Sequence, residues 1–421
     1  MLKTKKIVSF ETINKTLAKH KQVRARGHDL NILLRGNKRA ADIAIHYGFR
    51  PIESPSISRD DLSKTKTLLD LTPYKEEELK DHECLIRGEE KIALIRYYLE
   101  TGMISWPQPI MYYYEGPLMR EGTRRRLTNR QYYHLDILGT TKSIAEAALI
   151  KTAIEILKEE GYSDLIVLIN SVGDKDSIIR FSKELSLYYR KHLEVLQASC
   201  RQQFKKDPYE HLYCTHEKCR EICAGIPDPV SFLTEQSRHH FTEVLEYLET
   251  LGISYELKKD LIHNKKVHSQ SIFEIRTGED RKLLARGIRY NEVGKKMGMK
   301  RDVGNVGITI SLPESTGSKR IYLKKIVSPK VYFIQLGFDA KLKSLQVIDL
   351  LRSEKIPLAQ SLAKDKMVGQ LQIAENLKVP YSIIMGQKEA RENSVIVRDM
   401  NSHSQETVPI SELARYLKKL K

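Results

Sequence analysis

The sequence has no long apolar segment and few cysteines. No apolar run approaches the roughly 18 residues that a membrane span needs. The basic stretch at 1–26 also lacks the apolar core of a secretion signal. Five cysteines among 421 residues are an odd and low number, which argues against a disulfide framework and for a reducing compartment. We therefore expect a cytoplasmic protein with no membrane partner.

Acidic residues are also scarce relative to basic ones. The chain has 54 Asp and Glu against 71 Lys and Arg, a formal net charge of +17. This balance favours a polyanionic partner, and nucleic acid is the first candidate because neutralising its phosphates releases counterions. The alternative is a basic surface that serves only solubility. Charge by itself does not choose between RNA, DNA and an anionic membrane face.

The chain is long enough for two or three domains, and its hydrophobic content of 41% is enough for a real core. Composition divides it into a basic, helix-compatible lead at 1–35, a mixed α/β region at 36–325 and a smaller unit at 330–421. Residues from about 192 to 257 read as a helical insertion, and 317–325 read as a linker. The smaller unit alternates strands with helices, which is typical of a layered α/β domain.

Hydrophobic periodicity predicts individual strands and helices. In the α/β region it favours strands at 110–114, 165–170, 271–276 and 307–312, and a helix at 144–161 that ends at a glycine. In the last unit it favours strands at 331–337, 381–386 and 394–399, and helices at 341–354, 364–377 and 410–419.

Five groups of residues, taken in order, resemble motifs of the histidyl-tRNA synthetases, a family of class II aminoacyl-tRNA synthetases. They are YGFRPIESP at 47–55; IRGEEK at 86–91; YYYEGPLMR at 112–120 with RQYY at 130–133; NSVGD at 170–174 with FLTEQSRHHF at 232–241; and AENL at 374–377 with PYSIIMG at 380–386 and VIVRD at 395–399. Any one string is weak evidence. Together they run in the family's order from about residue 35 to the end of the sequence.

The resemblance implies an α/β (α+β) protein. Its class II catalytic-like domain would have an antiparallel sheet and a helical insertion, and an α/β anticodon-binding-like domain would follow. The resemblance also implies a homodimer, because Pro55 closes the first motif and that proline lies at the dimer interface in relatives. It implies tRNA as the partner, and histidine and ATP with Mg as ligands.

Amino-acid activation brings a carboxylate to the α-phosphate of ATP, so the site needs cations to hold repelling anions together. By resemblance, Arg120 and Arg130 are the ATP- or phosphate-binding residues. A solvated basic loop is the alternative for them, because further arginines lie nearby at 124–126. The residues carried over from the family's amino-acid pocket are Glu89, Arg289 and Tyr290.

Several positions depart from the family in ways that oppose ligation. His263 stands where the family has its catalytic arginine, and an imidazole is mostly neutral near pH 7 and cannot form a fixed two-pronged contact. Gly122 replaces a glutamate that meets adenine, and Glu314 falls where an arginine should meet the γ-phosphate. A shifted alignment that brings Arg301 or Arg320 to this last position is the alternative.

The amino-acid pocket is changed as well. Lys91 replaces a threonine and brings a cation towards the space for a substrate amine. Val267 and His268 replace paired tyrosines that enclose the substrate imidazole. Each lost oxyanion-type cation costs on the order of 3 kcal/mol, or a hundred- to a thousandfold in rate.

Three hypotheses about function follow. The favoured one is a protein that binds tRNA or other RNA on a synthetase scaffold, a pseudoenzyme whose ligation is lost or strongly reduced. The second is an active ATP-dependent histidine–tRNA ligase with a divergent site. The third is a regulatory subunit of ATP phosphoribosyltransferase. It ranks last because the paralogue with that role typically lacks the anticodon-like domain that 330–421 supply.

A candidate zinc site lies in the insertion and consists of Cys200, Cys214, Cys219 and Cys223. Zinc prefers four soft ligands in a tetrahedron, commonly with a close cysteine pair at one end. The last two of these cysteines meet that spacing. Ordinary reduced cysteines are the alternative, because the overall spacing fits no standard zinc finger.

Overall fold

The computed structural model describes residues 30–74, 84, 86–116, 118–121, 130–196, 198–209, 212, 216–299, 303–313, 320–326 and 328–420. Gly122, Cys214, Glu314, Arg301 and most of the basic lead therefore lie outside the described residues. The described parts of Met1–Ser54, Tyr98–Glu115 and Glu314–Lys421 form one compact unit, and those of Pro55–Tyr97 and Gly116–Pro313 form the other. Among the described helices, none is both long enough and apolar enough to cross a membrane.

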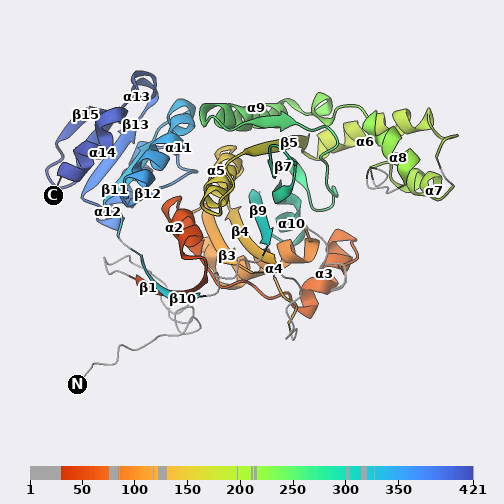
Figure 1. Ribbon diagram of the computed structural model, residues 1–421, viewed down its shortest axis with the longest axis horizontal. Helices are drawn as coiled ribbons and strands as arrows, with labels where there is room; N and C mark the ends of the chain where they lie inside the picture. Colours follow the sequence, from red (N-terminus) through yellow and green to blue (C-terminus); the bar gives the residue numbers. More distant parts are fainter. Residues whose placement is uncertain are drawn as a thin grey trace. The chain divides into compact units, whose positions relative to one another are not determined.

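An antiparallel sheet is the centre of the unit formed by Pro55–Tyr97 and Gly116–Pro313 (Figure 1). In hydrogen-bonded order its strands are β4 (Arg130–Leu138), β9 (Asn305–Pro313), β8 (Leu283–Arg289), β7 (Ser269–Thr277), β5 (Leu165–Gly173) and β6 (Tyr255–Leu257). Neighbouring strands in this series are antiparallel except β5 and β6, which are parallel. This sheet confirms the predicted fold class, and β5, β7 and β9 contain three of the predicted strands.

The helix α5 (Ile144–Glu159) is buried along most of its length and packs against β9 and α9 (Glu235–Thr250). It confirms the predicted helix, and Gly161 lies just beyond its end with a φ of 96°. That left-handed backbone suits glycine, so the sequence ends the helix here. Outside the insertion, this unit also contains α3 (Arg59–Leu69), most of α4 (Gly88–Glu100) and α10 (Asn291–Lys296).

The insertion has an apolar core of its own, shared by α6 (Lys175–Arg190), α7 (Ala198–Lys206), α8 (Glu217–Ala224) and the 3-10 helix η4 (Pro229–Phe232). The buried residues of that core are Val172, Phe181, Leu185, Tyr189, Leu196, Cys200, Phe204, Tyr209, Cys219, Ile222 and Ile226. The reading of 192–257 as helical throughout is wrong at its end. Strand β6 pairs there with β5, because a sheet edge offers backbone hydrogen bonds that local spacing does not reveal.

The other unit begins with two short strand pairs. Strand β1 (Leu30–Gly36) pairs antiparallel with β10 (Arg320–Ile326), and β2 (Arg50–Pro51) pairs parallel with β3 (Ile110–Glu115). The prediction of a linker at 317–325 is wrong in part, because β10 begins at Arg320. The basic lead at 1–35 was predicted to be compatible with a helix, but its last residues belong to strand β1. Both errors have the same cause, since each strand finds its partner far away in the sequence. The helix α2 (Lys38–His46) and the 3-10 helix η2 (Met103–Ser105) complete this part.

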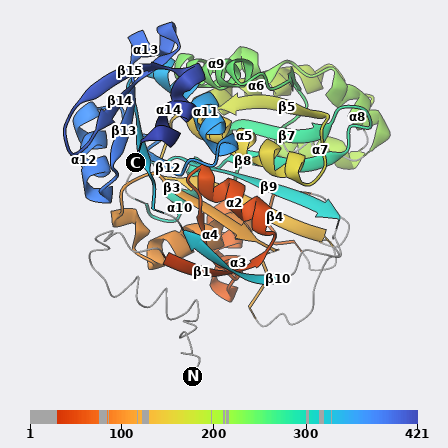
Figure 2. The same cartoon turned by 60° about the vertical axis from the view of Figure 1, so that its left-hand side comes forward.

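The C-terminal part of the same unit is a five-stranded sheet. Its order is β12 (Leu358–Gln360), β11 (Val331–Gln335), β13 (Tyr381–Met385), β14 (Ser394–Asp399) and β15 (Gln405–Pro409). The first three strands are parallel, and Figure 2 shows β13, β14 and β15 side by side, where pairing is antiparallel. Its helices are α11 (Phe338–Ser353), α12 (Met367–Leu377), α13 (Gln387–Glu392) and α14 (Ile410–Lys419). All six predicted elements are present, whereas β12, β15 and α13 were not predicted.

Helix α11 of this sheet contacts the end of α2 through two hydrogen bonds. The Tyr47 hydroxyl donates to Asp349 Oδ1 at 2.9 Å, and His46 Nε2 lies 3.1 Å from the Ile348 carbonyl oxygen. Burial lowers the pKa of His46, so its imidazole stays neutral at physiological pH.

Candidate functional site

Three buried residues form a charge cluster at the position where the sequence predicts an amino-acid pocket. Lys91 on α4 places its Nζ 3.2 Å from Oδ1 of Asp136 on β4. The hydroxyl of Tyr290, which follows β8, donates to the same carboxylate oxygen at 2.7 Å. Lys91 Nζ also lies 4.7 Å from the centroid of the Tyr290 ring. The three residues, called the Lys91 cluster below, are each at most 5% exposed, and the buried Lys91 ammonium is stabilised by a carboxylate and an aromatic ring of this chain.

The backbone of β9 closes over this cluster at Gly307. A Cβ atom built on Gly307 would lie 1.9 Å from Asp136 Oδ1 and 3.1 Å from Lys91 Nζ. Only a glycine therefore lets β9 pair with β4 while the carboxylate stays in place.

A second group beside the cluster is the imidazole of His134 on β4. Its Nδ1 lies 3.1 Å from Thr309 Oγ1, and its Nε2 lies 3.1 Å from the Gly116 carbonyl oxygen. Burial and the positive charges of Lys91 and Arg87 lower the pKa of His134 to about 3. His134 is thus neutral at physiological pH, and both of its ring nitrogens have protein partners.

Two buried glutamates precede Lys91 at the start of α4. The Arg87 Nε donates to Glu90 Oε1 at 2.8 Å, and Arg87 Nη2 donates to the Leu118 carbonyl at 3.1 Å. Glu89 is 1% exposed, and its Oε1 has no hydrogen-bond partner within the part of the chain that the structure describes. Burial raises the pKa of Glu89, although Arg87 and Arg120 act in the opposite direction.

The two arginines predicted to bind phosphate differ in what they contact. Arg120 Nη2 donates to the Tyr74 carbonyl, whereas its buried Nε has no hydrogen-bond partner among the described residues. Arg130, at the start of β4, donates from Nε to Ser311 Oγ at 2.6 Å and from Nη2 to the Ser311 carbonyl at 2.8 Å. Arg130 therefore holds β4 to β9. Phosphate binding by the two arginines stays a prediction.

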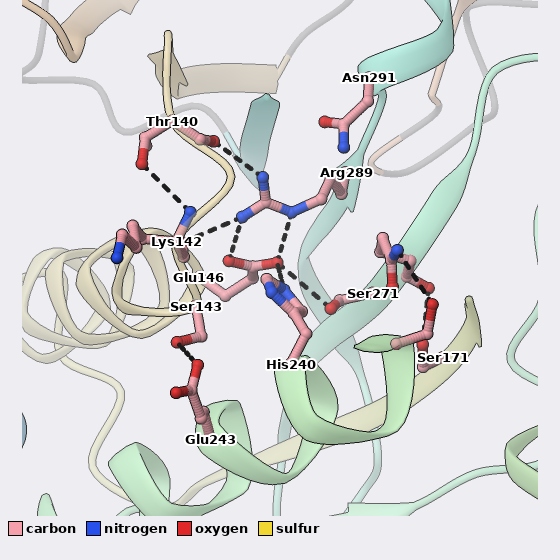
Figure 3. Close-up of polar contacts among 12 residues, drawn as sticks. Thr140, Lys142, Ser143, Glu146, Ser171, His240, Glu243, Ser271, Arg289 and Asn291 are labelled. Atoms are coloured by element: carbon pink, nitrogen blue, oxygen red, sulfur yellow. Dashed lines mark hydrogen bonds and ion pairs between the residues drawn. The ribbon is translucent and has the colours of Figure 1, made fainter. Parts of the chain in front are cut away.

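Arg289 lies apart from the Lys91 cluster, in a buried network with Glu146 (Figure 3). Its Nε donates to Glu146 Oε1 at 2.7 Å and its Nη2 to Glu146 Oε2 at 2.5 Å. Its remaining contacts are the carbonyls of Thr140 at 2.9 Å and Lys142 at 3.2 Å. Arg289 is 1% exposed. Its contacts thus give it a structural role, and its place in the amino-acid pocket stays a prediction.

The Glu146 carboxylate is the centre of that network. It also accepts a hydrogen bond from Ser271 Oγ at 3.2 Å, and His240 Nε2 lies 2.9 Å from Oε1 (Figure 3). Burial opposes its ionisation, but Arg289 and His240 outweigh that effect and lower the pKa of Glu146 to about 2. Sequence reasoning missed Glu146. The one available signal was a charged residue on a helix that is otherwise apolar in this region.

His263, which the sequence resemblance aligns with the family's catalytic arginine, is a neutral imidazole in the structure. Burial, with the nearby His268 and Arg286, lowers the pKa of His263 to about 3. Burial likewise lowers the pKa of His268 to about 4. His263 Nδ1 has no hydrogen-bond partner among the described residues, and Arg286 donates to Glu274 at 2.7 Å instead. A positive charge on either imidazole is therefore absent at neutral pH.

The described cysteines of the insertion lie in or against its apolar core. Cys200 and Cys219 are 2% and 0% exposed, and Cys223 is half-buried beside the Tyr189 hydroxyl at 3.5 Å. None of the three forms a disulfide with another cysteine that the structure describes. Within the described residues, no group of three or more His, Cys, Asp or Glu side chains could hold a metal ion. Because Cys214 lies outside those residues, the zinc site with all four cysteines stays a prediction.

Comparison with known proteins gives matches of two kinds along the sequence. A family model described as an anticodon binding domain matches residues 330–420. A histidine–tRNA ligase of Lysinibacillus sphaericus is 27% identical over 391 residues, covering 89% of this chain and 92% of the relative. A histidine–tRNA ligase of Fervidobacterium nodosum is 28% identical over 384 residues, covering 87% and 90%.

Among solved structures, apo histidyl-tRNA synthetase of S. aureus is similar with a TM-score of 0.49 and 20% identity, covering 100% of this chain and 99% of that one. The family model and the ligases that match nearly nine tenths of the sequence agree with the motifs in their order. This chain is similar to histidine–tRNA ligases over nearly nine tenths of its length, and its residues 330–420 match the anticodon binding domain.

Proposed function

We propose that this protein binds tRNA or another RNA through its anticodon-binding domain and basic surface, and that its histidine ligation is lost or strongly reduced. The proposal includes a homodimer in the cytoplasm. It is supported by the matched domain at 330–420, by the net charge of +17 and by the Lys91 cluster.

The Lys91 cluster carries the part of the proposal that concerns ligation. Family resemblance places the substrate amine beside position 91, where this chain has an ammonium of its own. Asp136 is already neutralised by Lys91, so an entering ammonium would meet a cation rather than a free carboxylate. Two like charges about 4 Å apart repel by roughly 4 kcal/mol at an effective dielectric constant near 20. Lys91 therefore opposes binding of an amino acid in its usual orientation.

The neutral His263 opposes the chemical step as well. Phosphate displacement needs fixed cations around the transferring group, and this imidazole has a pKa of about 3. Loss of one such cation costs on the order of 3 kcal/mol, a hundred- to a thousandfold in rate. The two departures act on different steps, so their effects on the overall rate multiply.

Binding of RNA is expected to weaken as salt rises. Between 50 and 200 mM salt, affinity for tRNA should fall about tenfold, as for two to three neutralised phosphates of a single strand. Filter binding with tRNA measures this, and duplex DNA of equal charge is the control. Absence of tRNA binding, or equal affinity for the DNA, would contradict the proposed RNA partner.

A second candidate function, a divergent ligase that uses ATP with Mg, is favoured by one observation. Glu89 Oε1 and Arg120 Nε are both buried without hydrogen-bond partners among the described residues, as expected of groups that wait for a ligand. Such groups support a surviving nucleotide subsite even where ligation is lost.

Histidine-dependent exchange of pyrophosphate into ATP separates the two functions. We expect no exchange above background from the natural protein. The variant Lys91→Thr, which restores the family's residue, should gain histidine affinity because it removes the competing ammonium. The matched control is Lys151→Thr, which removes another buried lysine, paired at 2.9 Å with Glu155 on α5. Exchange by the natural protein at a rate typical of ligases would favour the second candidate.

A further inference from the structure

A groove of about 640 Å³ runs along one face of α6. It shares no lining residue with the Lys91 cluster. The α6 side chains that line it recur every three or four residues, so they form a single stripe on the helix. They are Lys175, Ile178, Ile179, Ser182, Lys183 and Ser186. The facing wall comes from the loop before β7, from β7 itself and from α10.

The groove carries more positive charge than its own acids neutralise. Lysines at four positions line it, two on α6 and, on the facing wall, Lys265 and Lys296. The acidic lining residues already have partners, since Asp207 lies 2.5 Å from Lys265 and Glu292 lies 3.0 Å from Lys295. Within the described ranges, Lys175, Lys183 and Lys296 have no carboxylate within ion-pair distance, so they leave an excess of positive charge facing the groove.

Buried hydroxyl groups in the same groove lack partners. Ser269, the first residue of β7, is 4% exposed, and its Oγ makes no hydrogen bond with any described residue. The buried Oγ of Ser182 likewise has no hydrogen-bond partner among the described residues. Buried hydroxyls are nearly always satisfied in folded proteins, so hydroxyls that line a groove without a protein partner are available to a bound group. These two can donate to an anionic oxygen.

The remaining lining is apolar. Ile178 and Pro208 are partly buried, and Ile179 is 45% exposed although it is a large hydrophobic residue. A volume of about 640 Å³ is typical of sites for small molecules, which lie in a range of roughly 300 to 1,000 Å³. Cations, free hydroxyls and an apolar wall together match a ligand with a phosphate at one end and a flat apolar group at the other.

We propose that the α6 groove binds the phosphate of a nucleotide, with Lys183, Lys296 and Ser269 contacting the phosphate and the isoleucines covering the base. The nucleotide can be free or can be the phosphorylated end of an RNA. Partial burial of its ammonium and the charge of Lys266 lower the pKa of Lys296, with Glu292 opposing them, so a phosphate in the groove would stabilise the charged form of this lysine. Because a free nucleotide suffices, this inference does not depend on the RNA binding proposed above.

Isothermal titration of the full-length protein with AMP, adenosine and a short 5′-phosphorylated RNA tests the site. AMP should bind at least about tenfold more tightly than adenosine, because charge-assisted hydrogen bonds go to the phosphate. The double variant Lys183→Met/Lys296→Met should weaken AMP about tenfold or more, and Ser269→Ala should weaken it several-fold. If AMP gives no heat but the RNA loses affinity in the double variant, the phosphate comes from RNA and the site stands.

Two controls keep this result specific. Lys218→Met removes an exposed lysine of α8 outside the groove and should leave AMP affinity unchanged. Lys258→Met, which removes an exposed lysine just after β6 that also lies outside the groove, should leave AMP affinity unchanged too. Lys183 and Lys296 are both exposed, so the far-UV circular dichroism spectrum of the double variant should match that of the natural protein. The proposal would be overturned if the double variant bound AMP and the RNA as tightly as the natural protein does. It would also be overturned if the natural protein bound neither of them.

Discussion

The substitution Glu146→Gln is expected to lower the free energy of unfolding by about 3–5 kcal/mol, because it leaves one partner of a buried ion pair without its counter-charge. Glu146 and Arg289 are 0% and 1% exposed, and two hydrogen bonds of 2.7 and 2.5 Å join them. The amide keeps the shape of the side chain but carries no charge. It also cannot accept equally well from Arg289, His240 and Ser271. Urea unfolding followed by circular dichroism measures the loss.

An exposed ion pair provides the control for this experiment. Arg281 lies 2.9 Å from Glu256, and both side chains are 47% exposed. Solvent screens this pair, so Glu256→Gln should cost no more than about 1 kcal/mol. Similar losses in the two variants would mean that burial of the Glu146 carboxylate contributes nothing special to stability.

Acidification is expected to destabilise the protein steeply below about pH 6.5, the ordinary histidine pKa in the unfolded chain. Burial lowers the folded-state pKa of His134 and His263 to about 3 and that of His268 to about 4. A histidine with a lowered pKa contributes stability that is fully present above 6.5 and is lost as pH falls towards the folded-state value. Each such group removes up to about 1.4 kcal/mol per pH unit in that window.

The midpoint of urea unfolding at pH 7.5, 6.0 and 5.0 measures this dependence. His134→Gln removes one of the buried imidazoles. The loss of unfolding free energy per pH unit should therefore be smaller than in the natural protein by the contribution of one histidine. The exposed His239, with a side chain that is 70% accessible, is the control, and His239→Gln should leave the slope unchanged. A slope in His134→Gln equal to that of the natural protein would show that His134 does not remain neutral in the folded state. Glu146 adds to the decline only below about pH 4.5, because its folded-state pKa is about 2.

Much of the fold could be predicted from the sequence because local patterns match local structure. The strand at 394–399 and the helix at 410–419 have the predicted bounds. Their spacing of apolar residues corresponds to the faces that are buried. Strands β1 and β10 could not be predicted in this way, since each one depends on a partner that is far away in the sequence.

The site was harder to predict because several of its polar residues are buried inside strands and helices. Arg289 and Tyr290 are neighbours in a family motif, and the resemblance assigned both to one pocket. In the structure Arg289, the last residue of β8, contacts Glu146, whereas Tyr290, which caps the start of α10, contacts Asp136. His134 and Asp136 went unnoticed, although polar residues within an apolar strand were a signal that a buried network exists.

The close approach of Gly307 to Asp136 has a consequence for sequence variation. The carboxylate occupies the volume that any side chain at 307 would need, because a Cβ there would lie 1.9 Å from Oδ1. A larger residue at 307 becomes acceptable only if position 136 becomes smaller at the same time. The residues at positions 136 and 307 are therefore expected to covary. A mutational library that randomises 307 alone, with Asp136 kept, is expected to return glycine.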